Sequence, residues 1–235
     1  MYTLESRIRY SETDADGMLS MAGIMNYFQD CSTFHSEDSG VGVSYLKKIQ
    51  KAWMLSSWKI EMLRRPALGE KITVGTWPYD IKGIYAYRNF VMLDEEKKEI
   101  VKADSIWFLC DAVTGRPMRI QEEDVSAYGS PEPKLAMKPV SRKITLPEQM
   151  EERSKIVVLP HHIDTNHHVN NAKYVEIAQE VTERPQEVRE LQVEYKRAAV
   201  LGDTLVLKVG RTDQEEIIAL CREDRQVCAV VAQTY

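Results

Sequence analysis

The chain has 235 residues, of which 43% are hydrophobic and 29% charged, and its net charge is −5. This length can form one large domain or two small ones, each with its own core. The acidic balance argues against nucleic-acid binding, and no apolar run approaches the roughly 18 residues of a membrane span. The N-terminal "MYTLESRIRY" has no apolar h-region of a signal peptide. We therefore expect a globular protein of the cytoplasm.

The first half of the chain is predicted to contain a strand, a polar loop, one helix and four strands. The strand lies in "MYTLESRIRY", where polar and apolar residues alternate, and the helix begins near Ser20, a suitable N-cap. Its buried stripe has the i, i+3, i+4 spacing of one helix face; the stripe consists of Met21, Ile24, Met25, Phe28 and Cys31. The strands, rich in Val, Ile, Tyr and Trp, are expected at 54–64, 70–80, 84–94 and 99–111.

The second half repeats this order after a mixed-charge stretch at 116–152. A strand at 153–160 leads into a polar loop and then a helix that Asn170 or Asn171 caps and that ends before Pro185. Its inward residues are Ala172, Val175, Ala178 and Val181. Four strands follow, at 188–197, 203–211, 215–222 and 226–234. One helix followed by sequential strands predicts an antiparallel sheet wrapped on a helix, built twice.

The two halves also align residue by residue. "RYSETDADGMLSMAGIMNY" matches "LPHHIDTNHHVNNAKYVEI" at an offset of 150, and "IEMLRRPALGEKITV" matches "VEYKRAAVLGDTLVL" at an offset of 133. The matched pairs include Asp14 with Asp164, Asp16 with Asn166, Met18 with His168, Glu61 with Glu194, Arg64 with Arg197, and Gly69 with Gly202. The first half therefore has 150 − 133 = 17 additional residues, which we place in "HSEDSGVGVSYLKKIQKA".

These segments resemble a known family. "RYSETDADGMLSMAGIMNYFQD" and "DTNHHVNNAKYVE" are similar to the two copies of the hot-dog thioesterase motif, D-x-[DN]-x-H-V-N-N-x-x-Y. With "ADSIWFLCDAVTGRPMRI" closing the first copy, nearly the whole chain resembles the acyl-ACP thioesterases of bacteria and plant plastids, least so at 116–152.

The resemblance implies an α+β fold, the double hot-dog, with two long helices packed on a continuous antiparallel β-sheet. It implies an N-terminal repeat at 1–115 that holds the acyl chain and lacks the catalytic base. A connecting segment at 116–152 and a catalytic C-terminal repeat at 153–235 would follow. The implied activity belongs to fatty acid biosynthesis: hydrolysis of fatty acyl thioesters, with acyl carrier protein as the acyl donor and no cofactor.

The second polar loop has the groups that thioester hydrolysis needs. His168 is the candidate general base, because histidine alone has an unperturbed pKa near neutrality, about 6.5. Asp164 is placed to fix its tautomer and stabilise the imidazolium. Asn166 is expected to hold the water or donate to the thioester carbonyl, aided by backbone N–H groups at the start of the helix. The family pattern gives catalytic weight to the same three positions.

One departure from the family pattern concerns a later strand. Plant relatives have a glutamate and then a cysteine after "Y-R-R", where this chain has Ala198 and Ala199 in "VEYKRAA". Either Asp164 and His168 suffice, or Glu194 or Glu176 replaces that glutamate, or turnover is poor. A covalent cysteine mechanism has no residue at that position, so general-base hydrolysis is favoured.

The first repeat has Met18 where the second has His168, so it lacks the base. Met18, Met21 and Met25 are the candidate substrate-binding residues, because methionine suits an adaptable wall for an acyl chain. The sequence does not fix the preferred chain length.

Four histidines, at 161, 162, 167 and 168, also raise the question of a metal. Their pairs lack the fixed spacing of catalytic zinc motifs, and neighbouring side chains on a strand point to opposite faces. We therefore predict no metal and structural or surface roles for His161, His162 and His167. The four cysteines form no CxxC pair and lie in apolar patterns, so free buried thiols are expected; they are Cys31, Cys110, Cys221 and Cys228.

Three alternatives to acyl-ACP hydrolysis stay open on the sequence. The same chemistry on acyl-CoA is the first, a non-catalytic acyl-thioester binder is the second, and a hot-dog dehydratase is the third. A basic stretch in the connecting segment is a candidate surface for an acidic carrier protein, although charged runs are usually solvated; its residues are Lys134, Lys138, Arg142 and Lys143. A homodimer is also left open, since two fused repeats can satisfy their pairing internally.

Overall fold

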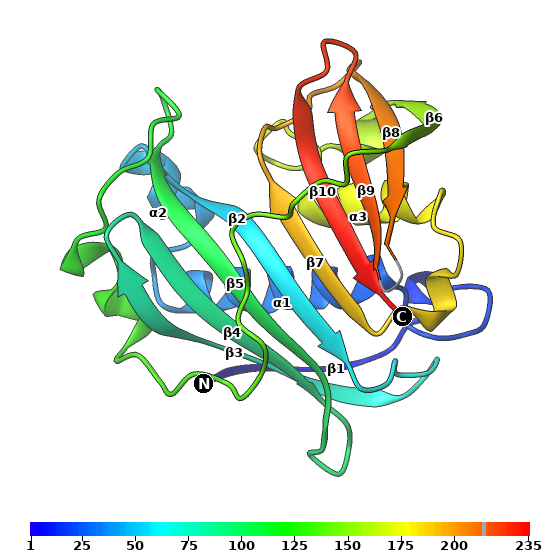
Figure 1. Ribbon diagram of the computed structural model, residues 1–235. Helices are drawn as coiled ribbons and strands as arrows, with labels where there is room; N and C mark the ends of the chain where they lie inside the picture. Colours follow the sequence, from blue (N-terminus) through cyan, green and yellow to red (C-terminus); the bar gives the residue numbers. More distant parts are fainter. Residues whose placement is uncertain (213–214) are drawn as a thin grey trace. The chain divides into compact units, whose positions relative to one another are not determined.

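A computed structural model describes residues 1–212 and 215–235 (Figure 1). The chain divides into two compact units, one made of Met1–Ser56 with Glu61–Val140 and one of Ser57–Ile60 with Ser141–Tyr235. Each unit contains an antiparallel sheet and a helix that packs on it, which is the predicted α+β class.

The strands of the first unit have the order β1-β3-β4-β5-β2, where the Ser57–Ile60 part of β2 is counted with the second unit. The strands are β1 (Tyr2–Arg7), β2 (Lys51–Met62), β3 (Lys71–Lys82), β4 (Tyr85–Leu93) and β5 (Glu99–Asp111), close to the predicted ranges. Antiparallel ladders join β1 to β3, β3 to β4, and β4 to β5. A bulge in β3 between Pro78 and Asp80 accommodates the proline, which has no N–H for the ladder.

Helix α1 (Met21–Asp38) lies against β1 and β3. The Ser20 hydroxyl accepts the N–H of Gly23 at 3.0 Å, so the predicted N-cap is confirmed. All five residues of the predicted stripe are at most 2% exposed. The short helix α2 (Val43–Lys48) lies in the segment 35–52, where the first repeat is expected to carry its 17 additional residues.

The sheet of the second unit has the order β7-β10-β9-β8-β6. Its strands are β6 (Glu151–Val157), β7 (Glu190–Tyr195), β8 (Thr204–Arg211), β9 (Glu215–Arg222) and β10 (Val227–Thr234), again close to prediction. Helix α3 (Asn171–Gln179) packs against β9 and β10 (Figure 1). The Asn170 side chain caps it by accepting the N–H of Ala172 at 2.9 Å.

Helix α3 ends earlier than the sequence predicts. Ala172, Val175 and Ala178 are buried as expected, but Val181 lies beyond the last turn and is partly exposed. The Thr182 hydroxyl donates to the carbonyl of Ala178 at 3.1 Å and competes for the acceptor of the next helical bond. The chain therefore leaves the helix after Gln179 instead of continuing toward Pro185.

Residues 116–140 lie in the first unit and contain only two short 3-10 turns, η2 (Glu122–Asp124) and η3 (Ser126–Tyr128). The fully buried Asp104 of β5 attaches this segment to the sheet. Its carboxylate accepts the N–H of Val140 at 3.2 Å and pairs with Lys134 at 3.2 Å. It also accepts the hydroxyl of Tyr79 at 2.8 Å.

Substituting Asp104→Asn should lower the free energy of unfolding by about 1–3 kcal/mol, because buried donors lose their acceptor. Urea denaturation measures this as a lower midpoint with an unchanged slope. The control is Asp80→Asn, which removes an exposed pair with Lys82 at 2.6 Å and should change stability little. Equal effects of the two substitutions would contradict the role given to Asp104.

All four cysteines are free and buried, as predicted. Burial raises the pKa of the Cys228 thiol to about 11 and that of Cys31 to about 12, so neither is a reactive thiolate at neutral pH. Within the described ranges, no helix combines the length and the apolar character needed to cross a membrane.

Candidate active site

The polar loop between β6 and α3 folds around Asp164. Oxygen Oδ1 of Asp164 accepts the N–H of Asn166 at 2.8 Å and that of His168 at 3.4 Å. The N–H of Asp164 donates to the His168 carbonyl at 2.8 Å, and the N–H of His167 donates to the Asp164 carbonyl at 3.1 Å. These bonds make an Asx turn, in which an aspartate organises the residues that follow it. His167 has the left-handed φ of 62° that the turn requires.

The three candidate catalytic residues therefore lie on one turn, but their side chains are not linked. The Nδ1 of His168 is buried and has no hydrogen-bond partner among the described residues. The expected bond from Asp164 to this ring is not formed, and Oδ1 of the carboxylate instead accepts backbone N–H groups of the turn. His168 is half-buried, and Asn166 is exposed beside it on the turn.

The other three histidines of the cluster have the predicted structural or surface positions. His162 is buried, and its Nδ1 accepts the N–H of Leu159 at 3.0 Å. Burial, with a smaller effect of His161, lowers the pKa of His162 and keeps it neutral. His161 and His167 are exposed. Over residues 1–212 and 215–235, no three His, Cys, Asp or Glu side chains are grouped to hold a metal ion.

The two candidate auxiliary carboxylates are engaged elsewhere. Glu194 of β7 is buried, accepts the N–H of Ile144 at 2.9 Å and pairs with Lys196 at 3.0 Å. Glu176 is exposed on α3 and pairs with Lys173 at 2.7 Å, one helical turn away. In the described part of the chain, neither contacts His168.

The first unit contains the same turn with different side chains. Oδ1 of Asp14 accepts the N–H groups of Asp16 and Met18 at 3.0 and 3.1 Å, and Gly17 has a left-handed φ of 73°. The other oxygen of Asp14 forms an ion pair with Arg65. This copy thus has no base, and an arginine compensates the charge of its aspartate.

Arg65 is a site residue that the sequence comparison did not single out. At the offset of 133 it corresponds to Ala198. The repeat aligns Arg64 with Arg197 and therefore Arg65 with Ala198. This alignment did not show that the Arg65 side chain reaches Asp14. The ion pair in the first unit now shows that a long side chain at this position can contact the turn.

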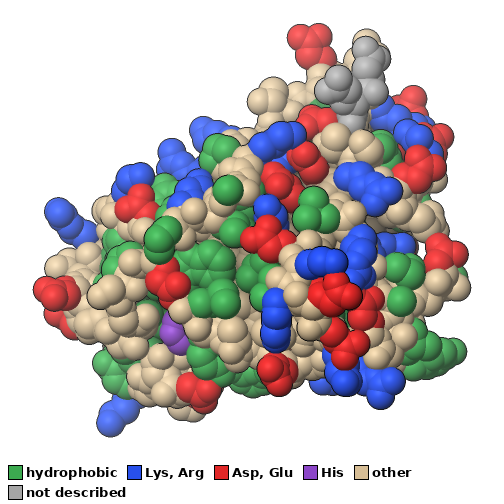
Figure 2. All heavy atoms as spheres, turned by 90° about the horizontal axis from the view of Figure 1, so that it is seen from below, with side chains coloured by type: hydrophobic (Ala, Val, Ile, Leu, Met, Phe, Trp, Pro, Cys, Tyr) green, Lys and Arg blue, Asp and Glu red, His purple; other side chains and the backbone are tan. Residues whose placement is uncertain are grey.

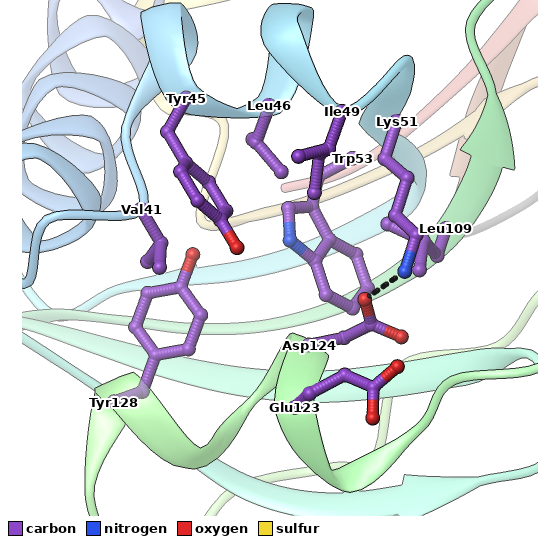
Figure 3. A pocket seen from close by; sticks show the side chains of 10 residues that line it. All are labelled: Val41, Tyr45, Leu46, Ile49, Lys51, Trp53, Leu109, Glu123, Asp124 and Tyr128. Atoms are coloured by element: carbon purple, nitrogen blue, oxygen red, sulfur yellow. Dashed lines mark hydrogen bonds and ion pairs between the residues drawn. The ribbon is translucent and has the colours of Figure 1, made fainter.

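A pocket of about 230 Å³ lies in the first unit (Figure 3). Most of its lining comes from the surplus segment with α2, from the start of β2, and from η2 and η3: Val41, Tyr45, Leu46, Ile49, Lys51, Trp53, Leu109, Glu123, Asp124 and Tyr128. Tyr45 and Tyr128 direct their hydroxyl groups into it beside the Trp53 indole, and Lys51 pairs with Asp124 at 2.5 Å at its side (Figure 3). The sequence analysis recognised the surplus segment that supplies half of this lining, but it did not predict that the segment forms a pocket.

The three methionines predicted to bind substrate have other surroundings. Met21 and Met25 are 2% and 0% exposed and belong to the core under α1. Met18 is half-buried and forms a bridge to Ala67 through its backbone. The lining of the pocket in Figure 3 includes none of the three.

Comparison with known proteins agrees with this duplicated architecture. Residues 1–128 match the acyl-ACP thioesterase N-terminal domain, and residues 146–233 match the acyl-ACP thioesterase C-terminal domain. The structure of an acyl-ACP thioesterase from Bacteroides thetaiotaomicron has a TM-score of 0.88 and 25% sequence identity, covering 99% of this chain and 96% of that one. The 12:0-ACP thioesterase from Umbellularia californica shares the fold, with a TM-score of 0.86, 19% identity, and coverage of 100% and 97% of the two chains.

Curated relatives are more distant in sequence. A chloroplastic acyl-[acyl-carrier-protein] hydrolase of Cuphea viscosissima is 27% identical over 206 residues, which are 81% of this chain and 50% of that protein. A chloroplastic oleoyl-acyl carrier protein thioesterase of Arabidopsis thaliana is 23% identical over 235 residues, 91% of this chain and 64% of that protein. The chain thus spans about half to two thirds of the length of these relatives.

The duplicated sheet-and-helix unit defines a protein of the double hot-dog class. With both halves matched in order, the chain belongs to the acyl-ACP thioesterase family.

Proposed function

We propose that this chain hydrolyses fatty acyl-ACP thioesters and releases a free fatty acid and acyl carrier protein. The observation that carries the proposal is the difference between the two Asp-centred turns. The first turn has Met18 and an aspartate paired with Arg65, whereas the second has His168 and places Ala198 where that arginine would be. Only the second copy keeps a base beside a carboxylate that no cation compensates in the described structure.

The reaction follows from this arrangement. His168 removes a proton from water, the resulting hydroxide attacks the thioester carbonyl, and the Asp164 carboxylate stabilises the imidazolium. Asn166 donates through its side-chain amide to the oxyanion of the tetrahedral intermediate, and the positive end of the α3 dipole favours the same negative charge. The intermediate expels the thiolate, which receives the proton from the imidazolium. Nδ1 of His168 gains a partner when water or substrate enters, because a buried ring nitrogen is seldom left unpaired.

The acyl chain is proposed to bind in the first unit. The pocket beside α2 supplies the apolar lining that such a ligand needs, through Tyr45, Trp53 and Leu109 among others. Met18, Met21 and Met25 do not line this pocket, and their role in binding the acyl chain stays a prediction from the sequence.

The partner is proposed to be acyl carrier protein. In the basic stretch, Lys134 pairs with Asp104 and lies 5.1 Å from the centre of the Tyr79 ring. On the face seen in Figure 2, basic and acidic side chains alternate. A cytoplasmic location and a homodimer stay predictions from the sequence.

The substrate class is tested by saturation kinetics on acyl-ACP and acyl-CoA that carry the same acyl group. We expect a higher kcat/KM for acyl-ACP across a panel of chain lengths, with free fatty acid as the product by mass spectrometry. A preference for acyl-CoA would contradict the choice of donor.

A second candidate is a non-catalytic binder of acyl thioesters. The absence of a carboxylate at Ala198 and of an Asp164–His168 bond favours it. Tight binding of acyl-ACP without release of fatty acid would identify such a protein.

Treatment with a chelator such as EDTA should leave hydrolysis unchanged, because the proposed base activates water without a metal. The measurement is the initial rate before and after dialysis against the chelator, with a zinc-dependent hydrolase treated in parallel as the control. Activity that is lost and then restored by zinc would contradict the mechanism.

A further inference from the structure

Two residues outside the proposed catalytic set hold the backbone beside His168. The N–H of Ala199, a fully buried residue, donates to the Tyr174 hydroxyl at 2.8 Å. The carbonyl of Ala199 accepts the N–H of Val169, the residue that follows His168, at 2.9 Å. Tyr174 lies on α3 and is 3% exposed. A helix side chain is thus connected to the base-bearing turn through a single residue.

The first unit provides an internal comparison. The equivalents of Tyr174 and Ala199 there are Ile24, at the offset of 150, and Pro66, at the offset of 133. The N–H of Leu19 donates to the Pro66 carbonyl at 2.8 Å, so the bond made by Val169 is present in this copy as well. Proline, however, has no N–H that needs an acceptor.

The helix residue and the residue that supports the turn therefore both change between the two units, from Ile24 and Pro66 to Tyr174 and Ala199. Where the buried residue is proline, the helix presents the apolar, fully buried Ile24. Where the residue carries an N–H, the helix presents a hydroxyl that accepts it. A buried N–H without an acceptor is strongly disfavoured, so the tyrosine is required by the residue that supports the turn rather than by helix packing.

We propose that Tyr174 is a positioning residue for His168 and that it acts through Ala199. The proposal rests on the proposed function, because it concerns the placement of the base in that reaction. Loss of the hydroxyl leaves the Ala199 N–H unpaired, and the segment that bonds to Val169 shifts to find water. The imidazole then leaves its reactive position while the acyl-binding pocket of the first unit is unaffected.

The first test is Tyr174→Phe in the full chain, compared with Tyr27→Phe. Tyr27 is a matched control, since it is 5% exposed on α1 and its hydroxyl donates to Glu12 at 2.7 Å in the first unit. We expect Tyr174→Phe to lower kcat about 10- to 100-fold with KM changed by less than about twofold. Tyr27→Phe should keep the wild-type kcat. Amide hydrogen exchange in peptides that cover Ala199 should become faster only in Tyr174→Phe.

The second test is rescue by Ala199→Pro, which copies the Ile24–Pro66 pair of the first unit. In the Tyr174→Phe background, the proline removes the unpaired N–H and should bring kcat back to that of Ala199→Pro alone. The proposal would be overturned if Tyr174→Phe lowered kcat as much in the Ala199→Pro background as it does in the wild type. It would also be overturned if Tyr174→Phe had the kcat of the Tyr27→Phe control. If Ala199→Pro does not fold, the comparison of the two tyrosine variants decides.

The outcome for His168→Ala separates this proposal from the proposed function. Full activity of His168→Ala overturns both. An inactive His168→Ala together with an unimpaired Tyr174→Phe overturns the positioning role alone.

Discussion

Replacing His168 by alanine should lower kcat by about 10²- to 10⁴-fold, the usual contribution of general acid–base catalysis. KM for acyl-ACP should change little, since the proposed acyl pocket is lined by other residues, such as Tyr45 and Trp53.

The matched control for this substitution is His161→Ala. His161 belongs to the same histidine cluster but is exposed, and its ring lies 4.1 Å from that of His162 without reaching the turn at Asp164. Its removal should leave kcat unchanged. A His168→Ala enzyme with full activity would remove the imidazole from the mechanism, and Asp164 would then be the remaining base on the turn.

Substituting Ala198→Arg should reproduce in the second unit the ion pair that Arg65 forms with Asp14 in the first. The new guanidinium would pair with Asp164 and cancel the charge that stabilises the imidazolium. We expect kcat to fall by about 10²-fold, comparable to the loss of one electrostatic stabiliser in other active sites. Stability should be maintained, because Ala198 is exposed.

The control for charge is Ala198→Gln, which adds a polar side chain without a cation. If the two substitutions reduce kcat equally, obstruction of the site explains the loss, and the electrostatic argument fails. If Ala198→Arg retains wild-type turnover, Asp164 has no role in stabilising the imidazolium.

The strand and helix positions could be predicted from the sequence because the hydrophobic periodicity and the internal repeat indicate the same elements. Strand alternation and the stripe on α1 are local patterns, and the repeat placed each of them twice. The end of α3 was predicted too late, because the Thr182 hydroxyl bonds to the Ala178 carbonyl and no apolar pattern reports such a bond.

The site was only partly accessible from sequence. The motif placed Asp164, Asn166 and His168 on one turn, where the structure also has them. The motif did not reveal that Oδ1 of Asp164 accepts the N–H groups of Asn166 and His168, because the direction of these N–H groups is set only when the turn folds. Arg65 and the pocket lined by Tyr128 depend on segments that meet only in the folded chain.

The left-handed residue of the turn distinguishes the two copies in one more respect. Glycine reaches this conformation without steric cost, and the first unit uses Gly17, whereas the second places His167 there at a cost of roughly 1–2 kcal/mol. A requirement for folding alone would favour glycine in both copies. The residue before the proposed base thus combines a less favourable backbone dihedral angle with a side chain that glycine could not supply.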